Sequence, residues 1–186
     1  MDKNDNQPKR VAGLLISRPF FGRWQAWLTA GTLGLVGLYV VFRVVTTSTS
    51  QLYLTPASSS VLNGSTMTVA VRMNSGADTV NAVQANLLYN AAQLQYISMD
   101  YIGSAFTLQA VSSGGAGSVK IARATSGGGE PTKGNQLVAN VKFKVLTAGV
   151  SSTISFASSS VVIRSTDNAN ILTQSKPGVY RLVSPT

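Results

Sequence analysis

Side chains able to carry out acid–base, nucleophilic or metal chemistry are scarce in this 186-residue chain. The chain has no His and no Cys, so it lacks the commonest general base, the commonest metal ligand and any thiol. Beyond residue 44 it has four carboxylates, Asp78, Asp100, Glu130 and Asp167, and neighbours among them are at least 22 residues apart. That spacing does not indicate the paired acids of a glycosidase. We therefore expect a protein that is not an enzyme and holds no metal or cofactor.

Two segments have compositions found in ligand-binding loops. Residues 167–170 read Asp-Asn-Ala-Asn, which offers oxygen ligands for Ca²⁺, but such residues more often form turns, and we interpret the segment as a turn. The glycines at 127–129 lack the strand–loop–helix context of a phosphate loop, and Lys133-Gly134 does not have its Gly-Lys-Ser/Thr order. We therefore interpret the glycines at 127–129 as part of a hairpin loop rather than a phosphate loop.

Four lysines, Lys120, Lys133, Lys142 and Lys144, are candidates for a basic patch. Lys142 and Lys144 are two residues apart and therefore share one face of a strand. No aromatic residues are interleaved to stack on bases, so we expect no nucleic-acid partner. We interpret these lysines as a solvated strand face that resists edge-to-edge aggregation.

An uncharged stretch at residues 24–42 is flanked by an arginine at each end. As a helix its 19 residues would reach about 28 Å, close to the ~30 Å hydrocarbon core of a bilayer. Aromatic residues lie near both ends of the stretch, where such side chains prefer the lipid headgroup region of a bilayer. The stretch predicts a transmembrane helix at 24–45. Its expected interfacial anchors are Arg23, Trp24, Trp27, Tyr39 and Arg43.

Charge asymmetry predicts the orientation of this helix. Residues 1–23 carry five basic and two acidic side chains, so the positive-inside rule places them in the cytoplasm and exports the rest of the chain. A cleaved signal peptide is the alternative, since residues 48–50 are small, but the apolar stretch exceeds the usual 7–15 residues. We predict a basic cytoplasmic tail at 1–23, a polar linker at 46–51 and an extracellular domain at 52–186.

The predicted extracellular domain shows the period-two alternation of β-strands. Met67, Val69, Val71 and Met73 alternate with polar or small residues. Such a pattern places one face of each strand in a core. Similar runs occupy 83–89 and 137–145, and shorter strands are expected at 94–99, 106–111, 119–124, 153–157, 161–164 and 179–182. Turn signals lie at 63–64, 74–76, 113–115, 127–129 and 148–149. We expect an all-β, jelly-roll sandwich of about nine strands.

Four segments, taken in order, resemble a cohesin domain over roughly residues 52–182. They are LNGST at 62–66, VNAVQANLLYN at 80–90 followed by Leu94, GSVKIA at 117–122 and GNQLVANVKFKV at 134–145. The cohesin pattern has Asp-Pro after its Tyr, where this chain has Asn90-Ala91. The wider group of such sandwiches includes some cellulose-binding modules.

The resemblance implies a non-catalytic module that docks a protein partner, with a dockerin-like module as the candidate. In cellulosomal cohesins, polar side chains on the outward face of the second of these strands grip the dockerin; the matching positions here are Ala82 and Gln84. We predict partner contact at Gln84, Asn86 and Leu88. Two alternatives stay open: a polysaccharide-binding or adhesive module, for which Tyr96 and Tyr101 are the clustered aromatics, and a structural subunit of an envelope assembly.

Overall fold

The computed structural model describes residues 49–126 and 129–185. The domain formed by these residues belongs to the compact unit Thr47–Thr186. The predicted tail, the predicted transmembrane segment and its five anchors lie outside the described residues. Within the described residues, no helix has the length and hydropathy needed to cross a bilayer.

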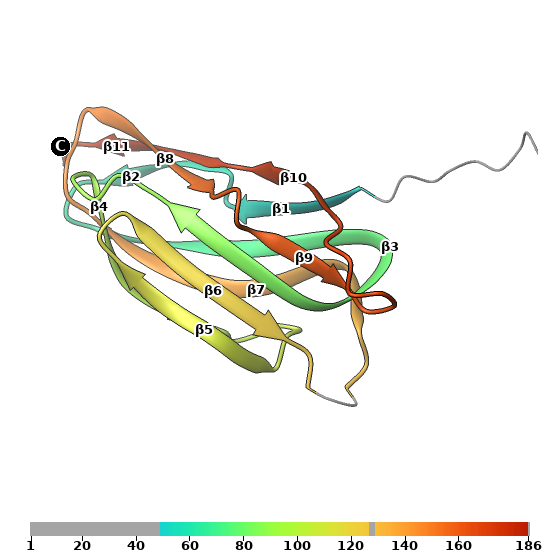
Figure 1. The fold of residues 1–186 in the computed structure, drawn as a ribbon. Helices are drawn as coiled ribbons and strands as arrows, with labels where there is room; N and C mark the ends of the chain where they lie inside the picture. Colours follow the sequence, from blue (N-terminus) through green and yellow to red (C-terminus); the bar gives the residue numbers. More distant parts are fainter. Residues whose placement is uncertain (1–48, 127–128, 186) are drawn as a thin grey trace, which may run out of the picture. The chain divides into compact units, whose positions relative to one another are not determined.

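Eleven strands and no helix make up the described part of the chain (Figure 1). The strands are β1 (Ser50–Thr55), β2 (Ser58–Leu62), β3 (Thr66–Leu88), β4 (Leu94–Asp100), β5 (Leu108–Gly115), β6 (Ser118–Ala124), β7 (Thr132–Val145), β8 (Val150–Phe156), β9 (Val161–Arg164), β10 (Leu172–Lys176) and β11 (Gly178–Val183). The all-β sandwich expected from the sequence is confirmed, with more strands than the nine expected.

The long strand β3 connects the two layers of the sandwich. Its N-terminal half pairs with β1 and β7, whereas its C-terminal half pairs with β6, β8 and β9. The first layer therefore has the strand order β10–β1–β3–β7–β4. In the second layer β5 pairs with β6 and β6 with β3; β3 also pairs with β9 and with β8, and β8 continues to β11 and β2. In Figure 1 the second layer lies toward the viewer and the first behind it.

Two predicted turns prove to be parts of strands. The signal at 74–76 is a bend inside β3, where Gly76 has a φ of 61° and the Ser75 hydroxyl donates to the carbonyl oxygen of Asp78 at 2.7 Å. The signal at 113–115 is the end of β5, and the turn follows at 116–117. A Cβ on Gly114 would lie 2.6 Å from the Tyr96 ring. The glycine is therefore needed for packing against that ring.

Strands β1, β2 and β10 are absent from the sequence prediction. The serine-rich β2 and the polar β10 lie at the ends of their layers and lack clear alternation. Strand β1 begins at Ser50, which is fully buried, so the last two residues of the predicted linker at 46–51 are strand.

The core fills the space between the layers with alternate residues of nearly every strand. Twenty-four buried hydrophobic residues between Leu52 and Leu182 form one cluster, to which β2, β5 and β10 contribute none. Tyr89 and Phe143 meet edge to face with ring centroids 5.0 Å apart. Tyr180 is also fully buried, and its hydroxyl donates to the Pro56 carbonyl at 2.9 Å. Burial raises the pKa of Tyr180 to about 12, so its hydroxyl stays a donor at physiological pH.

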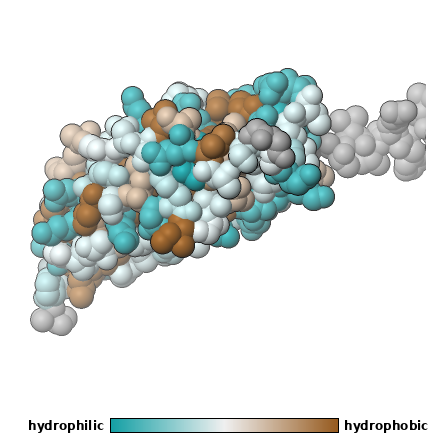
Figure 2. Space-filling model, turned by 90° about the horizontal axis from the view of Figure 1, so that it is seen from below, coloured by the Kyte–Doolittle hydropathy of each residue, from teal (hydrophilic) through white to brown (hydrophobic). Residues whose placement is uncertain are grey.

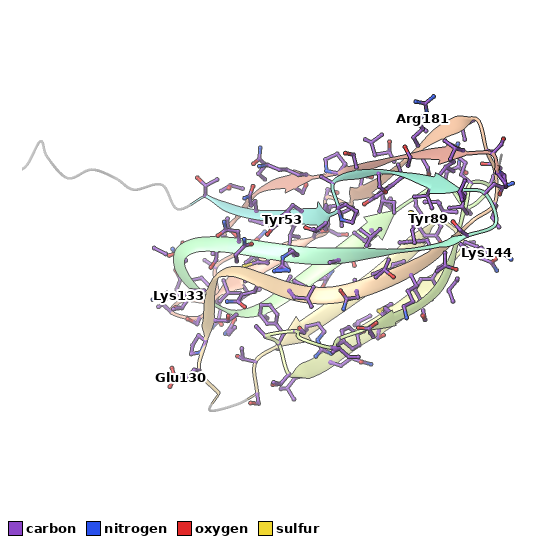
Figure 3. All side chains as sticks on the ribbon, turned by 180° about the vertical axis from the view of Figure 1, so that it is seen from behind. Tyr53, Tyr89, Glu130, Lys133, Lys144 and Arg181 are labelled. Atoms are coloured by element: carbon purple, nitrogen blue, oxygen red, sulfur yellow. The ribbon has the colours of Figure 1, made fainter. Side chains whose placement is uncertain are left out.

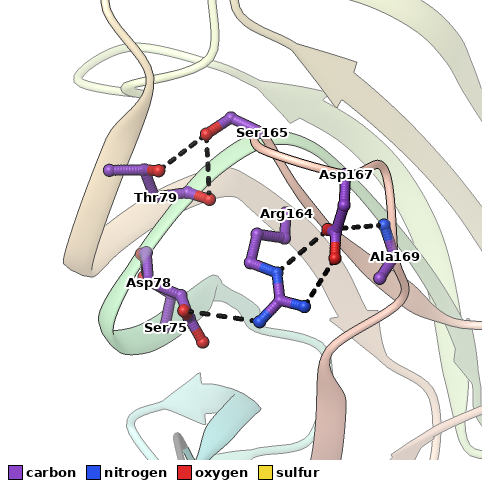
Figure 4. Close-up of polar contacts among 7 residues, drawn as sticks. All are labelled: Ser75, Asp78, Thr79, Arg164, Ser165, Asp167 and Ala169. Carbon is purple, nitrogen blue, oxygen red and sulfur yellow. Dashed lines mark hydrogen bonds and ion pairs between the residues drawn. The ribbon is translucent and has the colours of Figure 1, made fainter. Parts of the chain in front are cut away.

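A cluster centred on Arg164 joins the bend of β3 to the turn after β9 (Figure 4). The Arg164 guanidinium donates to both carboxylate oxygens of Asp167, at 3.0 and 2.7 Å, and lies 3.7 Å from Asp78. Asp167 also accepts a hydrogen bond from the Ala169 amide. Both oxygens of Asp167 are thus engaged within the protein, which supports the interpretation of 167–170 as a turn.

This cluster predicts an acid-dependent stability. The hydrogen bonds from Arg164 lower the pKa of Asp167 to about 2, below its ordinary value near 3.9. Because the pKa of this carboxyl is lower in the folded than in the unfolded state, its ionised form stabilises the fold at pH values above the unfolded-state pKa. This stabilisation is lost as the pH falls from about 4 to about 2. We expect Asp167→Asn to melt at a lower temperature than wild type near neutral pH, with a smaller further decrease over that acid range.

Thermal melts of unit Thr47–Thr186 at several pH values would measure this, since that unit contains the whole core cluster. Asp100→Asn is a useful comparison because Asp100 also has a lowered pKa, through its hydrogen bond from Asn140, but lies outside this cluster. Parallel curves for wild type and Asp167→Asn between pH 4 and 2 would contradict the assignment.

Candidate partner-binding face

The outer face of the second layer carries the residues predicted for partner contact. In β3, Val83, Ala85 and Leu87 are buried in the core, so the residues between them point outward. Gln84 and Asn86 are half-buried on that face, and the Leu88 side chain is 46% exposed. The structure thus places all three on one surface, and partner contact there stays a prediction.

The turn between β8 and β9 holds the two polar side chains in place. The Gln84 side-chain amide donates to the Ser159 carbonyl at 3.2 Å. The Asn86 amide donates to the Ser159 hydroxyl at 2.8 Å, and the Asn86 backbone N–H donates to the Ser160 hydroxyl at 3.1 Å. Because Gln84 and Asn86 are already oriented, a partner would meet a largely preformed polar row.

Neighbouring strands extend this surface with small and apolar side chains. Strand pairing aligns Ala82 with Ala124 and Ile163, and Gln84 with Ala122 and Val161. On β5, Val111 pairs with Ala122 and Leu108 with Ala124. Lys120 is opposite Asn86 and supplies a cation. We call this surface the candidate face. Its residues are Ala82, Gln84, Asn86, Leu88, Leu108, Val111, Lys120, Ala122, Ala124, Val161 and Ile163.

The candidate face has shallow hollows rather than a deep cavity. One depression of about 290 Å³ is lined by Gln84, Asn86, Val111, Lys120 and Ala122, among others. A second, of about 420 Å³, lies at the end of the face around Asn81, Ala82, Thr125 and Ile163. A flat surface that combines small apolar side chains with a few polar ones and little charge has the composition of a protein-docking surface.

Alternation along β6 is the signal that sequence reasoning did not use. Val119 and Ile121 are buried, so Lys120, Ala122 and Ala124 must point outward beside β3. Arg123 then has to point inward, where it is only 6% exposed. The structure separates the four lysines considered for a basic patch, because Lys120 lies on the second layer and Lys133, Lys142 and Lys144 lie on β7 of the first.

Arg123 fixes the segment that leads into β5. Its guanidinium lies 3.9 Å from the centroid of the Tyr101 ring and donates to the Phe106 carbonyl oxygen through Nε, at 3.1 Å, and through Nη2. Burial lowers the pKa of Arg123, but an arginine so placed remains charged. Its contact with Tyr101 is a cation–π interaction. Arg123 therefore positions the edge of the candidate face without belonging to its surface.

The tyrosines considered for a carbohydrate platform are engaged in the fold. Tyr96 packs its ring over Gly114, and Tyr101 carries Arg123 on its ring. Sugar platforms need exposed aromatic faces, and these two rings do not form a row of them. On the side of the domain seen in Figure 2, hydrophobic residues form separate patches between polar ones. That side therefore presents no broad apolar surface.

Comparison with known proteins assigns the domain to a family. The family model of the cohesin domain matches residues 53–178, which confirms the resemblance inferred from the four motifs. No curated protein gives a significant match to the sequence.

Solved cohesin structures share the fold at low sequence identity. A non-cellulosomal cohesin from the archaeon Archaeoglobus fulgidus is 20% identical with a TM-score of 0.58, covering 74% of this chain and 93% of its own. The cohesin module of a family 33 glycoside hydrolase from Clostridium perfringens is 12% identical with a TM-score of 0.60, and the match covers 74% of this chain and 98% of that module. The third ScaB cohesin of R. flavefaciens, solved with a group 1 dockerin, is 15% identical with a TM-score of 0.58, and the match covers 76% of this chain and 99% of that cohesin.

Proposed function

Because the chain belongs to the cohesin family, we propose that it is a non-catalytic binding module that captures a dockerin-like protein partner on its candidate face. Cohesin domains are non-catalytic, protein-binding modules. The observation that carries the proposal here is the flat face of β3, β5, β6 and β9, in which small and apolar side chains flank Gln84 and Asn86 held in fixed orientations.

The composition of the candidate face also limits the partner. Lys120 is the single formal charge among its residues, so charge pairing contributes little, and burial of small apolar side chains would supply most of the affinity. Ala82 and Gln84 stand where cellulosomal cohesins have polar residues that grip dockerins. We therefore propose a partner whose contacting helices are less basic and more apolar than a ligand for an Asn- and Asp-rich face.

The test is capture by the full-length protein from a detergent extract of its own cells, followed by mass spectrometry. The proposal requires an enriched protein whose sequence contains a dockerin-type module, and direct binding of that isolated module in calorimetry. If the enriched proteins lack such a module, or if the isolated module does not bind, the dockerin assignment fails.

We further propose that the module is displayed at the outer surface of the cell membrane by a helix at residues 24–45. Support comes from the length of its uncharged segment and from the basic residues that precede it. Protease added to cells stripped of their wall is expected to degrade the domain at 52–186 while sparing an epitope placed at the N-terminus. Protection of the domain until the membrane is lysed would contradict this topology.

A further inference from the structure

The outer face of the first layer has a charge character that the candidate face lacks. Along β7, Lys142 and Lys144 are exposed and alternate with the buried Val141, Phe143 and Val145, and Lys133 is exposed near the start of the strand, opposite Thr79. Strand pairing adds two more cations. Arg72 on β3 is opposite Tyr53 on β1, and Tyr53 is opposite Lys176 on β10. We call Arg72, Lys133, Lys142, Lys144 and Lys176 the basic face; Figure 3 labels Lys133 and Lys144.

Negative charge on this surface is small. Among the described residues, the ion pairs involve Arg164, Asp78 and Asp167, and none involves a cation of the basic face. Asp100 is the carboxylate that strand pairing places on this surface, and Asn140 donates a hydrogen bond to it at 2.9 Å. Glu130 precedes β7 near Lys133. Asp100 also interacts electrostatically with Lys142. The five cations outnumber these two carboxylates and form no salt bridge with them, so the surface keeps a positive potential.

The surroundings of these cations are hydrophilic. The outward residues between them are mainly hydroxyl and amide side chains, including Thr66 and Thr68 on β3 and Asn135 and Asn140 on β7. Ile97, on the edge strand β4, and Ile102, just after it, are exposed large hydrophobic residues at the edge of this surface rather than among the cations. A protein interface normally has an apolar centre, and this surface lacks one.

The spacing of the cations suits repeated charges better than one small anion. Lys142 and Lys144 are about 7 Å apart along β7, and Arg72 and Lys176 are separated by two strand spacings, or about 10 Å. Lys133 and Lys144 lie toward opposite ends of β7 (Figure 3). No single phosphate could contact more than a pair of these side chains, whereas a linear polyanion could follow the whole row.

We propose that the basic face binds an acidic polysaccharide, through charge pairing with these cations and hydrogen bonding of sugar hydroxyls to the surrounding Thr, Asn and Gln side chains. This goes beyond capture of a dockerin partner, because it uses the opposite layer of the sandwich. A module with both functions would hold its protein partner on one side and an anionic polymer on the other.

Two other polyanions fit the surface less well. An anionic bilayer favours apolar or aromatic side chains that enter the headgroup region, and Tyr53, the aromatic residue beside Arg72, has its hydroxyl bonded to Asn135. Single-stranded nucleic acid needs aromatic platforms for its bases, which this face does not offer.

The test measures binding of the full-length protein, in a nonionic detergent, to polygalacturonate and to chondroitin sulfate, with dextran as the uncharged comparison. We expect binding to at least one acidic polymer at about 50 mM salt, and loss of at least about tenfold in affinity at about 500 mM. The double variant K142E/K144E should bind the acidic polymer about tenfold or more weakly than wild type, and K142Q/K144Q should show a smaller but measurable loss of affinity. These side chains are exposed, so folding should be retained, which a thermal melt would verify.

Arg181→Glu is the matched control, because Arg181 is an exposed cation on β11 of the second layer, outside both named faces. Arg181→Glu should change the affinity for the acidic polymer by less than about twofold. Equal binding of wild type and K142E/K144E, binding of dextran as tight as that of the acidic polymers, or no binding of either polymer would overturn the proposal. So would tighter binding to phosphatidylglycerol vesicles or to an oligonucleotide. Dockerin capture should be unchanged in K142E/K144E, so failure of either proposal is recognisable separately.

Discussion

Ala122→Arg is expected to abolish partner capture, with a loss of affinity of about a hundredfold or more. Ala122 occupies the middle of the candidate face, between Gln84 of β3 and Val111 of β5. A bound partner would remove water from this position, so an arginine there would be both too large and unpaired. Burying an uncompensated charge costs roughly 3–5 kcal/mol, and every 1.4 kcal/mol is about tenfold in affinity.

Calorimetry with the captured dockerin module would measure this effect. Ser151→Arg is the control, because it places the same side chain at an exposed strand position of β8, opposite Arg181 and away from the candidate face. Since Ala122 points outward, the variant should melt within a few degrees of wild type. If Ala122→Arg binds the module as tightly as wild type, the partner uses another surface.

Phe143→Ala is expected to destabilise the domain by about 3–5 kcal/mol. The Phe143 side chain is fully buried and forms the edge-to-face pair with Tyr89. Its loss removes apolar burial, leaves a cavity in the middle of the core, and ends an aromatic contact of about 0.5–1.5 kcal/mol that is part of that total. A domain with total stability of about 5–15 kcal/mol would then be near its unfolding limit.

Urea denaturation of unit Thr47–Thr186 gives the free energy of unfolding directly. Ile102→Ala is the control, since Ile102 is as apolar but 82% exposed, and it should change the stability by less than about 0.5 kcal/mol. A loss below about 1 kcal/mol for Phe143→Ala would mean that the core repacks around the cavity, or that this arrangement of β7 and β3 is incorrect.

Strand faces were predictable where hydrophobic alternation was regular. The run from Met67 to Met73 lies in β3 and faces the core, and the alternation at 83–89 correctly placed Gln84, Asn86 and Leu88 outward. The run at 137–145 lies in β7 and faces the core from Ala139 onward, but a register shift buries Val138 there in place of Leu137. Where alternation fails, the prediction also fails. Serine-rich β2 was not recognised, and the two glycines that end β5 were assigned to a turn.

Neighbouring strands, in contrast, were not predictable. Arg72 and Lys176 lie 104 positions apart in the sequence, and they share a face only because β1 pairs with both β3 and β10. The same holds for Val111, Ala122 and Gln84, which three different strands bring into one row. Register between distant strands is decided by how the core packs, and no local pattern encodes it.

The sequence alone therefore determined that the chain is an all-β cohesin domain, with few residues capable of catalysis, and which side chains of its regular strands face outward. The period of two is local, so neighbouring residues suffice to establish it. Only the tertiary structure decided that Lys120 and Lys142, which look alike in the sequence, belong to opposite faces. That separation arises because β3 bends between the layers, so β6 and β7 each pair with a different half of the same strand.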